Sequence, residues 1–205
     1  MAQVAGMAVL VGMHVEGKTP RRPVDVILYV DGIWLPPSPV DQGARATVSW
    51  MYARLGIALA WSNASPKSGV QAAGAVAIQI RFTRESTRSV SNDALAFALP
   101  YSGGINAITV IYPRIQAITG GQIGFELSLL AHVLAHEIGH VLQGTTLHSE
   151  TGVMKAHWTH WECDDMVRRP LDFAPEDAQM IVRGLTAWKH SAAPANPDKK
   201  RGSAR

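Results

Sequence analysis

The residues with the clearest chemical potential are His136, Glu137 and His140, which form the pattern His-Glu-x-x-His. On a helix with about 3.6 residues per turn, side chains four positions apart share a face, so both imidazoles can reach one metal ion. Zinc is the ion that this arrangement typically binds. Glu137 is rotated by about 100° from His136, which keeps it out of the ligand set but within reach of a water molecule, as a general base.

A catalytic zinc site needs about three protein ligands and one open position, so a third ligand must lie downstream. His148 comes eight residues after His140, just beyond Gly144, where a chain that turns back beneath the helix can offer another imidazole. Met154 follows and can form an apolar floor for the site. Glu162, 22 residues after His140, is a rival third ligand.

Residues 136–154 resemble the zinc site of the metzincin metallopeptidases, which carry HExxHxxGxxH followed by a turn that bears a methionine below the metal. The resemblance implies that His136, His140 and His148 bind one catalytic Zn²⁺ ion. It also implies that Glu137 is the general base, that Met154 is the Met-turn residue, and that the protein is a hydrolase whose substrate is a polypeptide.

The spacing after His140 departs from the metzincin pattern. In the family, glycine and histidine stand three and six positions after the second ligand, whereas Gly144 and His148 stand four and eight positions after His140. The loop is thus two residues longer, which indicates an atypical branch of the clan rather than a standard matrixin or astacin.

Other readings of the same residues remain open. The chain could be a zinc-stabilised binding domain without catalysis, although Glu137 would then serve no structural purpose. It could be a gluzincin-like zinc hydrolase that uses Glu162, or a globular binding protein with incidental histidines that holds no zinc.

Several neighbouring residues have both a functional and a structural interpretation. His132 lies one helical turn before His136. It is either a fourth ligand or a hydrogen-bonded histidine beside the site. His157 is a candidate for binding substrate or stabilising the oxyanion, because Ala156 occupies the position of a tyrosine found in some metzincins. Trp158 and Trp161 either form a wall of the specificity pocket or pack the lower part of the domain.

The elements that position these residues follow from hydrophobic periodicity and from glycine and proline breaks. We expect strands over 24–30, 57–61, 74–82, 94–99 and 105–112, and helices over 41–55, 122–143 and 175–189, with 84–93 a surface loop, 101–104 a turn and 148–172 irregular. This order predicts a mixed α/β fold. The resemblance implies a mixed, mostly parallel twisted sheet of about five strands, an active-site helix and a small C-terminal lobe that ends in a helix.

Two further expectations concern the surroundings of the site. The leucines of the helix over 122–143 lie opposite His136 and His140, so this helix should pack one face on the sheet while its histidines line a cleft. The resemblance implies that substrate pairs with an edge strand, for which 94–99 is the candidate; a buried strand is the alternative.

Composition leads us to expect a signal-like or disordered segment over residues 1–22 and a disordered basic tail over 191–205. The resemblance implies that 23–190 is a peptidase domain with an upper lobe (23–143) and a lower lobe (144–190). With 205 residues and 47% hydrophobic content, the chain can bury a sizeable core. Residues 2–15 are apolar, a hint of export to a secreted or periplasmic location.

The distribution of charge and the length of the apolar segments argue against a nucleic-acid partner and against a membrane span. Residues 191–205 account for the whole net charge of +3, so the domain itself presents no basic face and we expect no nucleic-acid partner. No other segment reaches the roughly 18 apolar residues of a membrane helix. Cys163 is the only cysteine, so no disulfide can form within the chain.

Overall fold

Five short apolar runs form one mixed sheet in the computed structural model, which describes residues 23–64, 74–85, 91, 93–99 and 106–192. The strand order is β2-β1-β3-β5-β4. Neighbours pair in parallel except β4 and β5, which are antiparallel. The strands are β1 (Val26–Gly32), β2 (Leu59–Ser62), β3 (Val76–Thr83), β4 (Ala96–Leu99) and β5 (Asn106–Ile111). The predicted mixed α/β fold with a mostly parallel sheet of five strands is therefore confirmed.

Three of the helices were predicted and two were not. The predicted helices are α1 (Ser38–Arg54), α3 (Ile123–Gln143) and α5 (Pro175–Ala192). α1 begins before the predicted position 41 because Pro39 stands in its first turn, where the missing N–H breaks no helical hydrogen bond. α2 (Tyr112–Thr119) and α4 (His160–Arg168) correct the prediction, since 105–112 was expected to be strand throughout and 148–172 irregular.

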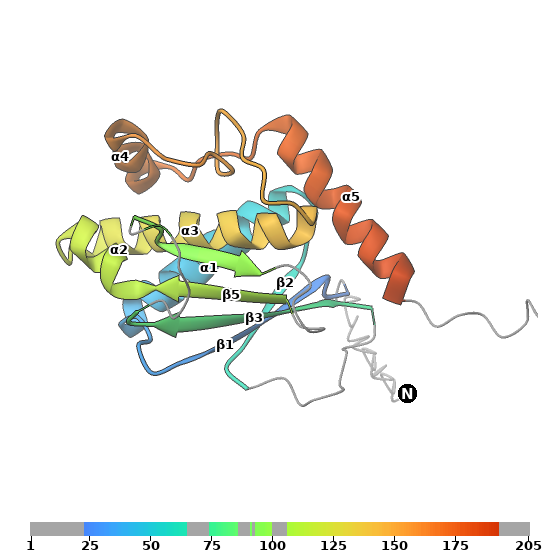
Figure 1. Cartoon of the computed structure of the whole chain (residues 1–205), viewed down its shortest axis with the longest axis horizontal. Helices are drawn as coiled ribbons and strands as arrows, with labels where there is room; N and C mark the ends of the chain where they lie inside the picture. The colour runs from blue at the N-terminus through green and yellow to red at the C-terminus, as the bar shows by residue number, and fades with distance from the viewer. Residues whose placement is uncertain (1–22, 65–73, 86–90, 92, 100–105, 193–205) are drawn as a thin grey trace, which may run out of the picture.

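The core lies between the sheet and the helices. Alternate residues of the central strands are fully buried, Leu28, Ile78 and Ile108 among them, and they join the leucines of α3 in one hydrophobic cluster. α3 packs against α1, α4, α5 and β4. Figure 1 shows α4 on the side of α3 that faces away from the sheet, and α5 running from that side past the end of α3 toward the sheet, where it contacts β3. α3 is thus the central element of the fold.

Because of this central position, more of α3 is buried than the sequence predicts. The sequence predicts a helix with one buried face, but every residue from Ser128 to Leu142 is buried, His136 and His140 included. The C-terminal elements cover the face that carries the histidines. The polar groups of this helix therefore need hydrogen-bond partners inside the protein.

Some sequence predictions fall outside the described part of the chain. They concern residues 1–22, the tail from residue 193 onward, the turn at 101–104 and most of the loop at 84–93. Within the described residues, α5 continues to Ala192, slightly past the predicted start of the tail. None of the helices described is sufficiently long and apolar to cross a membrane.

α3 and α5 approach closely at Gly184. A Cβ atom at this position would overlap the backbone carbonyl of Leu142, whereas a Cβ atom at Gly124, on α3, would meet nothing within 4 Å. The absence of a side chain at Gly184 therefore allows the C-terminal helix to pack on the helix that carries the histidines.

We predict that Gly184→Ala destabilises the protein by about 1–3 kcal/mol, the usual cost of overpacking a close contact. Gly124→Ala is the matched control and should be neutral or stabilising by up to about 1 kcal/mol, because alanine favours helix without a clash. Urea unfolding measures both values. Equal stability of the two variants would contradict the close contact.

Candidate metal centre

Three histidines from two segments converge at one point. His136 and His140 lie on α3, and His148 lies after the helix end at Gly144, whose left-handed conformation (φ 69°) reverses the chain. The Nε2 atom of His140 is 2.9 Å from Nε2 of His136 and 3.3 Å from Nε2 of His148. The sequence proposed these three residues as ligands, and the structure brings them together.

Hydrogen bonds at the far side of two rings determine which nitrogen carries the proton. His136 Nδ1 is 2.9 Å from the carbonyl oxygen of Val153, and His140 Nδ1 is 2.9 Å from that of Thr145. A carbonyl oxygen only accepts, so each Nδ1 is the donor, and a neutral imidazole then has a lone pair on Nε2. The two Nε2 atoms then lie 2.9 Å apart with a lone pair on each, a repulsion that a shared cation would relieve.

The spacing of the nitrogens fits a small divalent ion. Zinc binds histidine nitrogen at about 2.0–2.1 Å, so two ligands at a tetrahedral angle stand about 3.4 Å apart. The contacts of 2.9 and 3.3 Å are close to that value, and the three candidate ligand atoms all lie within 4.8 Å of one another. Three nitrogen ligands leave a fourth position for water or substrate.

Burial keeps the imidazoles neutral, the form that binds metal. His136 is 8% exposed, and burial, followed by the neighbouring His140 and His148, lowers its pKa to about 4. Burial also lowers the pKa of His140 and of the more exposed His148. At neutral pH the three rings therefore offer lone pairs without first losing protons.

Glu137 follows His136 on α3, and its side chain contacts the sheet edge at β4. Its side chain is 7% exposed, and its carboxylate accepts a hydrogen bond from the backbone N–H of Ala98 in β4. Burial raises the pKa of Glu137 to about 8, with the hydrogen bond acting in the opposite direction. A carboxylate with a raised pKa next to a possible metal ion is suited to accept a proton.

Met154, the Met-turn residue implied by the resemblance, packs against the helix that carries the histidines. It is fully buried, and a Cβ atom at Gly139 would come within 2.5 Å of its sulfur. Gly139, one residue before His140, thus allows the methionine to contact the α3 backbone. The N–H of Ser149 donates to the Met154 carbonyl at 2.9 Å, which joins the methionine turn to the residue after His148.

His132 stands outside the three-histidine cluster, and both its ring nitrogens have partners. Its Nδ1 donates to the carbonyl of Ser128 at 2.7 Å, and its Nε2 accepts from the N–H of Leu171 at 2.9 Å. Trp158 contacts the rings of both His132 and His136 in edge-to-face geometry and donates from its indole N–H to the Gly152 carbonyl. His132 and Trp158 therefore pack inside the protein next to the histidine cluster and help to hold its side chains in place.

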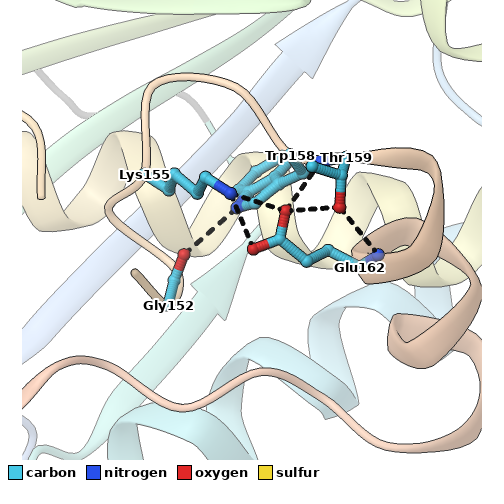
Figure 2. A network of polar contacts seen from close by, with 5 residues as sticks. All are labelled: Gly152, Lys155, Trp158, Thr159 and Glu162. Carbon is cyan, nitrogen blue, oxygen red and sulfur yellow. Dashed lines mark hydrogen bonds and ion pairs between the residues drawn. The ribbon is translucent and has the colours of Figure 1, made fainter. Parts of the chain in front are cut away.

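Glu162 is not part of the histidine cluster. Its two carboxylate oxygens accept from Lys155 Nζ at 2.9 and 2.8 Å, and one of them also accepts from the N–H and hydroxyl of Thr159 (Figure 2). Hydrogen bonding from Lys155 is the main cause that lowers the pKa of Glu162 to about 2. The reciprocal contacts with Thr159 form a capping box that starts α4.

His157 and Trp161 lie at the surface, the latter 77% exposed. Burial first, and then the charge of His157, lowers the pKa of His148, so His157 is near the third candidate ligand. Asp93, just before β4, also feels the charge of His157, although the hydrogen bond from Ser91 is the main reason for its lowered pKa. His157 therefore lies near the cluster and the approach to the edge strand.

Sequence reasoning missed the groups that hold these side chains. The carbonyls of Val153 and Thr145 orient two histidines, and the Ala98 amide orients Glu137. A hydrogen bond to a backbone group leaves no recognisable pattern of side chains in the sequence, so these partners could not be predicted. Asp177 was read only as part of a helix start, yet it is buried behind the loop that carries His148.

No protein-family model matches the chain, and a search of curated proteins found no match.

We predict that zinc binding depends on His148 and is independent of Glu162. Native mass spectrometry should find about one zinc ion per chain in the wild type and in Glu162→Gln, because Glu162 is already held by Lys155 and Thr159. His148→Ala removes a nitrogen ligand and should weaken binding more than about 100-fold, beyond the usual effect of an outer-shell change. The opposite ranking of these two variants would place the third ligand at Glu162.

The raised pKa of Glu137 predicts a pH-dependent cost to metal-free stability. Folded Glu137 keeps its proton to about pH 8, whereas the ordinary value is 4.5, so its contribution to stability is lost as pH rises between these values. Glu137→Gln should therefore stabilise the metal-free protein increasingly from about pH 5 to about pH 9, by about 1.4 kcal/mol per unit of pKa shift.

Thermal unfolding in the presence of a chelator, at several pH values, measures this effect. Exposed Glu150 provides the control, since Glu150→Gln removes a carboxylate from solvent and should show no such trend. A pH-independent difference between Glu137→Gln and the wild type would contradict the prediction.

Proposed function

We propose that this protein is a zinc-dependent metalloendopeptidase in which His136, His140 and His148 hold the metal and Glu137 is the general base. The observation that carries the proposal is the meeting of three imidazole Nε2 atoms beside a buried glutamate of the same helix. A structural zinc site is closed by four protein ligands, whereas three ligands and an adjacent base suit a hydrolase.

The proposal extends to the metzincin clan. Support comes from the third histidine, which follows a glycine helix end, and from Met154, which packs beneath the helix against Gly139. The two extra loop residues do not prevent His148 from reaching the other histidines. Within that loop, the Thr145 carbonyl accepts from His140, so the longer connection also helps to orient a ligand.

β4 provides the position for a polypeptide substrate. Among the described strands β4 is one of the two at an edge of the sheet. The carbonyl of Leu95, just before β4, accepts from the N–H of Ile111, which directs the backbone groups of alternate residues toward β5. By this alternation Ala96 and Ala98 turn their backbone groups to the open edge. An extended peptide would pair there with the backbone of Ala96 and the carbonyl of Ala98, because the Ala98 N–H already donates to the Glu137 carboxylate.

Glu137 moves the proton in the proposed reaction. Zinc, when bound, supplies Lewis-acid chemistry that acidifies water and polarises a carbonyl group. The Glu137 carboxylate accepts the proton of the attacking water and donates it to the leaving nitrogen. The Ala98 amide holds the carboxylate toward the substrate edge, and a cation nearby favours its ionised form at neutral pH.

We predict that Glu137→Gln lowers kcat for peptide hydrolysis at least about 100-fold, the typical contribution of a general base. Zinc content should stay unchanged, because the glutamate is not a ligand. The assay uses zinc-loaded protein and a library of fluorogenic peptides, with Glu150→Gln as the control. A wild type that binds zinc but cleaves none of the library, or a fully active Glu137→Gln, would contradict the proposal and favour a zinc-stabilised binding domain.

A further inference from the structure

A buried carboxylate lies behind the metal site, on a different element. Asp177 is in the first turn of α5 and is 1% exposed. Its Oδ1 atom accepts from the hydroxyl of Ser149 at 2.8 Å and from the side-chain amide of Gln143 at 3.2 Å. The peptidase reaction as proposed above makes no use of this group.

The two partners of Asp177 border the loop that joins the second and third candidate ligands. Gln143 is the last residue of α3, three positions after His140, and Ser149 directly follows His148. One carboxylate oxygen therefore connects both ends of the segment 144–148. Because the Ser149 N–H also donates to the Met154 carbonyl, the residue beside His148 is fixed from two directions.

The charge of Asp177 has no close counterpart among the described residues. Asp177 takes part in none of the ion pairs found there, and its Oδ2 atom and Gln143 Oε1 are buried without a hydrogen-bond partner. A buried charge without compensation is costly. Its field reaches His140: burial dominates and lowers the pKa of this histidine, while Asp177 acts in the opposite direction.

We propose that Asp177 is a positioning residue and the buried counter-charge of the metal centre: it holds His148 in place through Ser149 and strengthens cation binding by its negative charge. The inference depends on the proposed metal centre but not on peptidase activity. Neutral histidines bring no charge to a dication, so the carboxylates of Glu137 and Asp177 together offset its two positive charges.

This role predicts opposite effects of Asp177→Asn on the two states of the protein. Asparagine keeps the size of the side chain and an oxygen that accepts from Ser149, but it removes the charge. The metal-free protein should become more stable, with a higher Tm, because the uncompensated charge is gone. Zinc affinity should fall by about tenfold or more, the usual effect of an outer-shell change.

The variant Ser149→Ala tests the positioning role of Asp177 separately from the effect of its charge. It breaks the link between Asp177 and the residue after His148 while it leaves the carboxylate in place, so zinc affinity should fall without any gain in metal-free Tm. Asp165→Asn is the control, because Asp165 is an exposed carboxylate of α4 and should change neither quantity. Affinity is measured by competition with a zinc-chelating dye, and Tm by calorimetry with and without zinc.

Unchanged zinc affinity in both Asp177→Asn and Ser149→Ala would overturn the proposal. An equal loss of Tm in the metal-free and zinc-loaded forms of Asp177→Asn would also overturn it, because Asp177 would then be a tie between α3 and α5 only. Failure of the wild type to bind zinc would refute the metal centre itself, whereas zinc-loaded wild type without peptide hydrolysis would leave the role of Asp177 intact and refute only the enzyme.

Discussion

The structure depends on one constraint, which is that the helix carrying two histidines and a glutamate is buried on all sides from Ser128 to Leu142. α3 lies between the sheet edge and the C-terminal elements, so each polar side chain on it needs a partner from a neighbouring segment. Backbone groups supply most of these partners: Val153 and Thr145 for the histidines, and Ala98 for Glu137. The same contacts that satisfy buried polar groups therefore orient the candidate site.

Burial of α3 also explains why the C-terminal part of the chain has so little regular structure around residues 149–158. This segment must present the Val153 carbonyl to His136, the Met154 side chain to Gly139 and the Trp158 ring to His136. A regular helix or strand cannot present a backbone carbonyl, an aliphatic side chain and an aromatic ring from such closely spaced residues to the same helix. The turn at Gly152, with φ 74°, provides the change of direction.

Local patterns allowed much of the fold and the histidine cluster to be predicted. The spacing of His136 and His140 follows from helix geometry alone, and Gly144 marks the helix end that the structure shows. α4 was missed because its apolar stripe is short, although Thr159 and Glu162 form a capping box that a search for helix starts would have found. α2 follows β5 without a break, whereas the expected strand ends at residue 112 and no element is predicted between it and the helix at 122.

Long-range partners could not be predicted, since nothing in the sequence places Lys155 beside Glu162 in preference to a metal, or Leu171 beside His132. Asp177 is the clearest example, because an aspartate in the first turn of a helix is ordinarily a solvent-exposed dipole partner. In the structure it is buried, with Gln143 of α3 and Ser149 in contact with its carboxylate.

The longer loop before His148 illustrates how these constraints act together. Compared with the metzincin pattern that the proposal invokes, two extra residues give the chain more conformations to lose when the proposed third ligand is fixed. The structure limits that freedom at both ends: His140 holds the Thr145 carbonyl, and Asp177 and Met154 hold Ser149. Each of these contacts involves a buried polar group that needs a hydrogen-bond partner in any case. The loop is therefore held in one conformation without additional polar groups. An extended ligand loop is thus compatible with a well-defined site when its anchors belong to the core.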